Sequence, residues 1–71
     1  MNKKDRKDFG LFIKATRDCF YLTIRDAAKR IKISPATLSR VERGHRTSLD
    51  VFVKLCRWTN IDPNTVLGFN Q

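Results

Sequence analysis

The sequence has little of what enzymes, membrane proteins and disulfide-stabilised proteins need. Its 71 residues include three glycines, two prolines, two cysteines and one histidine. No apolar run approaches the roughly 18 residues that cross a bilayer, and the polar start of the chain lacks the pattern of a secretory signal. The sequence therefore predicts one small cytoplasmic domain.

The scarce reactive residues also argue against a metal site or a catalytic site. Cys19 and Cys56 lie far apart and form no Cys-x-x-Cys pair, so we expect both to be small buried apolar residues. A tetrahedral zinc site would have to recruit His45 and scattered carboxylates, so no metal and no cofactor is predicted. The sequence contains no glycine-rich phosphate loop and no Ser–His or Cys–His arrangement, and it predicts no enzyme.

The chain does contain a large excess of positive charge. Fifteen Lys and Arg stand against seven Asp and Glu, which gives a net charge of +8, and five Phe, one Tyr and one Trp suffice for a small core. We expect a polyanionic partner, with nucleic acid ahead of an anionic membrane surface. Residues 29–46 carry six basic residues and one acid, whereas residues 47–71 are balanced. Solvation of exposed helix faces alone would not predict this asymmetry.

Caps and breakers divide the chain into helices rather than strands. Apolar residues at helical spacing predict a first helix over residues 8–20, preceded by a basic arm at residues 1–7. Thr23 and Asp26 have the form of a capping box, which predicts a short second helix. The residues expected on its inward face are Ala27, Ala28 and Ile31.

Three further helices are predicted from capping residues, two of which precede a proline. The caps are Ser34 before Pro35, Ser48, and Asp62 before Pro63. The predicted ranges are 35–43, 49–58 and 62–67, with Gly44 and Asn60 ending the first two of these helices. The predicted fold class is all-α, with five helices in one domain over residues 8–71.

The second and third helices are joined only by residues 32–34, which is typical of a helix-turn-helix. Ala28 has to be small where the two helices cross. We expect Ile33, Leu38 and Val41 to close the core between them.

The segment from Thr23 to Gly44 resembles the phage-repressor-type (XRE-like, Cro-like) helix-turn-helix family, and residues 39–44, Ser-Arg-Val-Glu-Arg-Gly, are its most specific part. The resemblance extends over roughly residues 9–67. It implies a compact lambda-repressor-like domain that binds double-stranded DNA, and a partly buried ion pair between Arg17 and Glu42. A pair between Glu42 and Arg46, four residues on, is the alternative.

The sequence departs from the family pattern at three positions. Ile24 replaces the usual Gln at the start of the second helix, and Pro35 replaces a polar residue at the start of the third. Lys32 replaces Gly in the turn, where a left-handed conformation costs about 1 kcal/mol. We therefore expect narrower base reading than is usual in the family.

The third helix is predicted to enter the major groove with the face opposite its core residues. Residues expected to read bases are Ala36, Ser39 and Arg40, with Arg40 placed to contact a guanine edge. Residues expected to bind phosphates are Arg25, Lys29, Arg43, His45 and Arg46. The basic arm is expected to follow the DNA backbone, to enter the minor groove, or to serve as a solubilising tail.

A dimer is expected because one recognition helix with two or three base-reading side chains cannot discriminate an operator within a genome. The fourth helix is predicted to bury Leu49, Phe52, Val53 and Cys56, and to leave Val51, Leu55 and Trp58 free. The predicted contact residues are Trp58, Val66 and Phe69, and the alternative is that Trp58 and Phe69 simply close the core.

The sequence thus predicts a small repressor that binds a palindromic operator as a homodimer and has no small-molecule effector. The alternative from another class is a protein-interaction module, such as an antitoxin or an inhibitor built on the same scaffold. Ile24 and Pro35 favour this alternative, because both stand at positions that usually face DNA.

Overall fold

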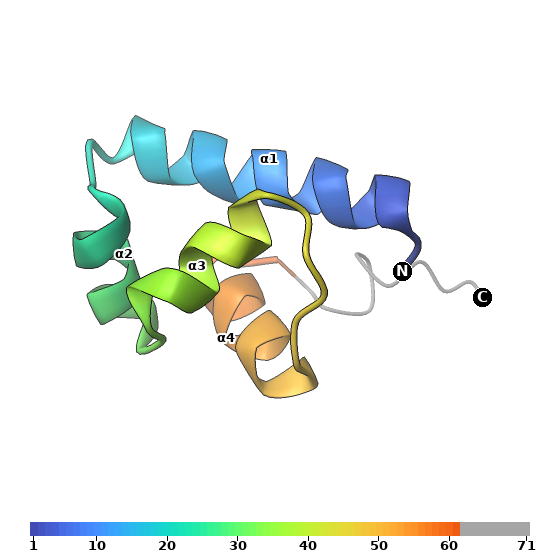
Figure 1. The fold of residues 1–71 in the computed structure, drawn as a ribbon. Helices are drawn as coiled ribbons and strands as arrows, with labels where there is room; N and C mark the ends of the chain where they lie inside the picture. The colour runs from blue at the N-terminus through green and yellow to red at the C-terminus, as the bar shows by residue number, and fades with distance from the viewer. Residues whose placement is uncertain (62–71) are drawn as a thin grey trace.

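The computed structural model describes residues 1–61, which form four helices and no strand. The helices are α1 (Lys3–Cys19), α2 (Ile24–Ile31), α3 (Pro35–Glu42) and α4 (Leu49–Thr59). Figure 1 shows α1 lying across the other three helices, with α3 between α2 and the loop that leads to α4. The all-α class is confirmed for this part of the chain, and the predicted fifth helix lies outside the described residues. None of the described helices is long and apolar enough to cross a membrane.

Each helix begins at a side chain that accepts a hydrogen bond from the amide three residues on, which satisfies one of the free N–H groups of the first turn. These capping residues and their oxygen–nitrogen distances are Asn2 (2.8 Å), Thr23 (3.1 Å), Ser34 (3.1 Å) and Ser48 (3.2 Å). The last three are the caps that the sequence predicts.

The predicted start of the first helix is wrong. Helix α1 begins at Lys3, because Asn2 caps it, and residues 3–7 are its first turns rather than an arm. Arg6 fixes this segment to the rest of the domain, since its Nε donates a hydrogen bond to the carbonyl oxygen of Gly44 at 3.2 Å. The start of α1 is therefore part of the folded domain.

The core lies between α1 and the other three helices. Its residues are Phe9, Ile13, Ala27, Ala28, Ile31, Leu38, Val41, Phe52, Leu55 and Cys56. The rings of Phe9 and Phe52 lie 5.2 Å apart between centroids, in a tilted arrangement. This contact joins α1 to α4 within the core.

Two predictions about burial are wrong. Leu55 is fully buried and Leu49 is 70% exposed, whereas Phe52 is buried as predicted. Val51 and Trp58, which were expected to be free, pack against the core, so the inward face of α4 is only partly the one expected. Cys56 is buried as predicted, but Cys19 is exposed because it lies on the side of α1 that faces away from the other helices.

Gly10 allows the backbones of α1 and α3 to approach each other closely. A Cβ atom at this position would lie 2.4 Å from the carbonyl oxygen of Val41 and 2.8 Å from that of Glu42. Any larger side chain would have to push α1 away from the end of α3. The glycine thus sets the distance between α1 and the helix predicted to read DNA.

Candidate nucleic-acid interface

The turn between α2 and α3 has the short, left-handed geometry of a helix-turn-helix. Lys32 ends α2 with φ 71° and ψ 46°, and the amides of Lys32 and Ile33 both donate to the carbonyl oxygen of Ala28, at 2.8 and 3.0 Å. Lys54 Nζ donates to the carbonyl oxygen of Lys32 at 3.3 Å, which ties the turn to α4. These contacts fix the position of α3 relative to α2.

Helix α3 buries one face and exposes the other. Leu38 and Val41 are buried, whereas Ala36 and Arg40 are exposed and Ser39 is half-buried. Pro35 occupies the first turn, where its missing N–H costs no hydrogen bond. The exposed face therefore presents a methyl group and a guanidinium, with the Ser39 hydroxyl at its edge.

The end of α3 directs the next basic residues into an exposed loop. Gly44 adopts φ 86°, and the amides of Gly44 and His45 donate to the carbonyl oxygens of Val41 and Arg40, both at 3.0 Å. This pair of bonds is a Schellman motif, which turns the chain out of the helix axis. His45 and Arg46 follow as exposed side chains.

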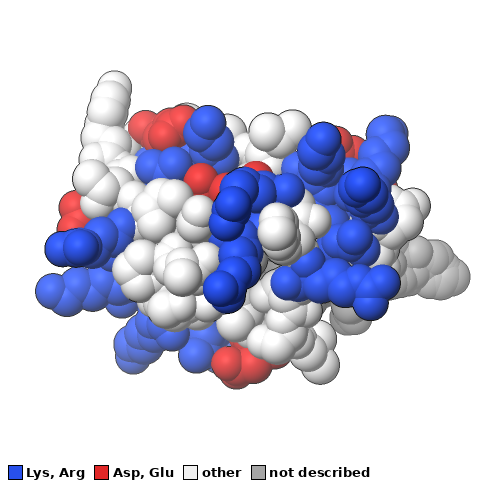
Figure 2. Space-filling view, in the orientation of Figure 1, with Lys and Arg blue, Asp and Glu red and all other residues white. Residues whose placement is uncertain are grey.

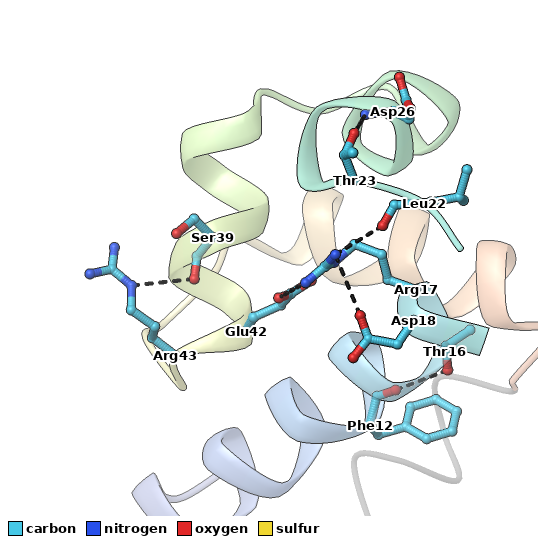
Figure 3. Close-up of polar contacts among 10 residues, drawn as sticks. All are labelled: Phe12, Thr16, Arg17, Asp18, Leu22, Thr23, Asp26, Ser39, Glu42 and Arg43. Atoms are coloured by element: carbon cyan, nitrogen blue, oxygen red, sulfur yellow. Dashed lines mark hydrogen bonds and ion pairs between the residues drawn. The ribbon is translucent and has the colours of Figure 1, made fainter. Parts of the chain in front are cut away.

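Arg43 lies along the outer side of α3. Its Nε donates to the carbonyl oxygen of Ser39 at 3.4 Å, as Figure 3 shows. The bond is long and exposed, so a phosphate oxygen can replace the carbonyl at little cost.

The exposed basic residues gather on the face that carries α3. Figure 2 shows Lys and Arg side chains over α2, over α3 and at the start of α1, and they outnumber Asp and Glu on this face. Arg25 and Lys29 are exposed on α2. The structure thus brings the predicted base-reading and phosphate-binding residues to neighbouring helices and one loop.

An ion pair joins α1 to the end of α3 (Figure 3). Arg17 Nε lies 2.7 Å from Glu42 Oε2 and Nη2 lies 3.0 Å from Oε1, and only 12% and 6% of the two side chains are exposed. Arg17 Nη1 also donates to the carbonyl oxygen of Leu22 at 2.9 Å, so one guanidinium holds α1, α3 and the loop before α2. The hydrogen bond to Glu42 raises the pKa of Arg17 above its usual range, against the opposing effect of burial.

Two residues that hold this interface together are absent from the sequence predictions. Gly10 sets the approach of α1 to α3, and a lone glycine inside an amphipathic helix is the signal that could have revealed it. Arg6 holds the carbonyl oxygen of Gly44, next to His45 and Arg46. Arg6 gives no such signal, because it lies in a run of charged residues.

A family model described as helix-turn-helix matches residues 13–66. The chain belongs to the XRE-type helix-turn-helix family. No curated protein and no solved structure matches the chain. The match includes all of α2, α3 and α4, and it begins within α1 at Ile13.

Membership in the helix-turn-helix family makes the chain a DNA-binding domain of the kind found in transcription regulators, and the family is not typically enzymatic. The first turns of α1, with Arg6 and Gly10, precede the matched residues. These turns are nevertheless fastened to the end of α3 by a hydrogen bond and by close backbone packing. The helix-turn-helix of this chain is thus supported by a segment that the family model does not cover.

Proposed function

We propose that the chain is a repressor that binds a palindromic operator as a dimer and reads bases in the major groove with α3. One observation carries this proposal: the exposed Ala36 and Arg40 lie on the face of α3 opposite the buried Leu38 and Val41. A helix in the major groove reads base edges with such a face.

Three residues of α3 suit particular contacts with DNA. Arg40 has the geometry to bind O6 and N7 of a guanine with two hydrogen bonds, and the methyl group of Ala36 suits the methyl group of thymine. Ser39 lies at the edge of this face, where its hydroxyl can reach a base edge or a phosphate. The residues proposed to bind phosphates are Arg25, Lys29, Arg43, His45 and Arg46.

The dimer contact is proposed near the end of α4. Trp58 is half-buried, and its ring centroid lies 6.1 Å from that of Phe20, whose side chain is 58% exposed. Trp58 also packs against the core, as the alternative to a dimer contact expects, so the proposed contact uses its remaining exposed part together with Phe20. Val66 and Phe69, which lie outside the described residues, remain in the proposed contact.

Selection of bound sites from a library of random duplex DNA tests this function. We expect enrichment of an inverted repeat whose half-sites lie about 34 Å apart along the duplex. Binding to the selected site should weaken at least about 500-fold between 50 and 200 mM salt, the factor for five phosphate contacts, since two chains together offer more than five such side chains. A library without an enriched motif, or affinity that is insensitive to salt, would contradict the proposal.

A protein-interaction module is the second candidate, because apolar side chains are exposed on the outer side of α1. Leu11 is 60% exposed and Phe12 is 41% exposed. Ile24 departs from the family pattern, and on sequence alone this departure favours the interaction module. Its side chain packs against the core, which explains the apolar residue without a partner protein. An antitoxin or inhibitor that uses only this surface would bind its partner protein without binding duplex DNA, so the same selection distinguishes the two candidates.

A further inference from the structure

A cleft of about 440 Å³ lies between the start of α1 and the loop that joins α3 to α4. Figure 1 shows these two segments side by side, and the hydrogen bond from Arg6 to the Gly44 carbonyl joins them. The volume falls within the range of about 300 to 1,000 Å³ that is usual for small-molecule sites. Part of its wall is built from residues that precede the family match.

The floor of the cleft is apolar and rigid. Phe9, Val41 and Phe52 line it, and all three belong to the buried core. Leu49 forms part of the rim and is largely exposed. Met1 also lines the cleft and is 45% exposed. A flat ring or a short branched chain on this floor would cover the exposed apolar surface of Leu49 and Met1, which favours binding.

The polar part of the wall is made of basic side chains. Arg6, His45 and Arg46 line the cleft, and no carboxylate of residues 1–61 does so. Arg6 uses Nε and Nη1 for the carbonyl oxygens of Gly44 and Met1. Its Nη2 has no hydrogen-bond partner within this part of the chain, so it is free to donate to an anion.

Thr47 adds a buried hydroxyl to the same wall. Its Oγ1 is shielded from solvent and makes no hydrogen bond to any described residue, and Thr47 lines the cleft. An unsatisfied buried hydroxyl costs about 1 to 3 kcal/mol, which a ligand oxygen at this position would recover. The hydroxyl lies beneath the surface of the wall that carries the arginines, and a change of the Thr47 rotamer would bring it to a ligand in the cleft.

We propose that this cleft binds a small organic anion, a carboxylate or phosphate attached to a flat or branched apolar group. The arginines hold the anionic group, and the Thr47 hydroxyl joins them after its rotamer changes. The apolar group lies on the floor of the cleft, against the exposed side chains of Leu49 and Met1. Inorganic phosphate and the DNA backbone fit the cleft less well, because neither supplies an apolar group for the floor.

Binding of this anion would lower affinity for DNA, a consequence that rests on the proposed function. His45 and Arg46 line the cleft and are also proposed to bind DNA phosphates. Anion and DNA would compete for these two side chains, so each weakens the binding of the other by the same factor. The anion would release the protein from its operator.

Titration of the ¹⁵N-labelled full chain with benzoate, 2-naphthoate and phenyl phosphate tests the cleft directly. At least one of the three should give saturable shifts that are largest for the amides of residues 44–49. Neutral 2-naphthamide and inorganic phosphate should bind at least fivefold more weakly. The proposal is overturned if none of the three anions saturates by about 10 mM, above the millimolar range of weak ligands, or if the amide binds as tightly as its acid.

Two variants locate the binding groups, and a third provides the control. Thr47→Val keeps the shape of the side chain and removes the hydroxyl, and Arg46→Gln removes an exposed charge. Each should weaken binding of the anion about fivefold or more, as expected for loss of a hydrogen bond to a charged group. Arg30→Gln makes the same charge change on α2, away from the cleft, and should leave the affinity unchanged. Equal losses in Arg46→Gln and Arg30→Gln would mean attraction by net charge only and would overturn the site.

The coupling is measured as DNA affinity with and without saturating anion at constant ionic strength. The anion should weaken binding of the selected duplex at least fivefold, and 2-naphthamide should have no effect. Unchanged DNA affinity with the cleft occupied would contradict the coupling. If the chain binds no duplex at all, the proposed function fails, while the titration still decides whether the cleft binds the anion.

Discussion

The guanidinium of Arg17 makes more connections than any other polar group of the interface. It joins α1 to Glu42 at the end of α3 and to the carbonyl oxygen of Leu22 before α2. Loss of one partner from a buried pair is costly, because the remaining charge is left without compensation in a poorly solvated place. The pair thus orients the recognition helix from the side opposite its exposed face.

Glu42→Gln should lower the free energy of unfolding by about 2 to 3 kcal/mol, since the amide keeps the shape but removes the charge that faces Arg17. Asp50→Asn is the matched control, because Asp50 pairs with Lys54 at 3.4 Å on the surface, where 76% of its side chain is exposed. An exposed pair contributes about 0 to 1 kcal/mol. Denaturant unfolding of both variants measures the difference, and equal losses would show that Arg17 gains nothing from burial with Glu42.

Gly10→Ala should destabilise the protein by about 1 to 3 kcal/mol, the range for forcing an extra methyl group into a packed core. The usual effect in a helix interior has the opposite sign, since alanine is favoured over glycine by about 1 kcal/mol. The sign reverses here because the methyl group would meet the carbonyl oxygens of Val41 and Glu42. Thermal unfolding monitored by circular dichroism decides the sign, and a raised midpoint would show that α1 and α3 separate at little cost.

Some residues of the candidate site could be predicted from local sequence patterns, and others could not. The exposed face of α3 followed from helical periodicity alone. Arg17 and Glu42 were singled out together only through the resemblance, because a pair 25 residues apart leaves no local pattern. The cleft was not predicted, since its walls come from α1, α3 and α4 and no motif links them.

At the scale of the helices, a left-handed residue follows each of the four described helices within two positions of its last residue. These residues are Tyr21 (φ 56°), Lys32 (φ 71°), Gly44 (φ 86°) and Asn60 (φ 61°). The left-handed region is easily adopted by glycine and tolerated by asparagine, but it is strained for tyrosine and lysine. The turns after α1 and α2 therefore hold strain that the rest of the domain has to offset.

Tyr21→Gly should raise the free energy of unfolding by about 1 kcal/mol, because it removes the left-handed strain. Little packing is lost, since the Tyr21 side chain is 95% exposed. Tyr21→Ala is the control, because alanine keeps the Cβ atom that causes the strain and should give no such gain. Chemical denaturation compares the two variants, and equal stabilities would place the strain elsewhere.

Helix starts were predicted better than helix faces. Ser34 and Ser48 are strong local signals, and both cap helices as predicted. Asn2 was overlooked because the charged residues after it resembled a tail. The face of α4 was assigned correctly at Phe52 and Cys56 but wrongly at Leu49 and Leu55. Its apolar residues are nearly consecutive, so periodicity alone could not distinguish Leu49 from Leu55 as the buried one.

At the scale of the whole molecule, the proposed dimer should assemble on a palindromic operator, whose two half-sites each bind one chain. Sedimentation of the protein with a palindromic duplex should show two chains per duplex at saturation. Trp58→Ala should weaken formation of this complex at least tenfold, in the range found when an interface tryptophan is truncated. Because Trp58 also packs against the core, circular dichroism has to show that the Trp58→Ala protein is folded. Leu11→Ala, which truncates an exposed apolar residue on α1, should have little effect on the complex. A one-to-one complex at saturating protein would exclude the dimer.

Competition binding by Arg40→Ala tests the central claim, that the exposed face of α3 reads base edges. The difference in binding free energy between the selected duplex and a scrambled duplex should fall by about 1 to 3 kcal/mol per half-site. Salt-dependent binding to the scrambled duplex should remain. Arg57→Ala is the control, because it removes an exposed arginine from α4 instead. It should prefer the selected duplex over the scrambled duplex as strongly as the unchanged protein does. An Arg40→Ala protein that folds normally and keeps the full preference for the selected duplex would contradict the claim.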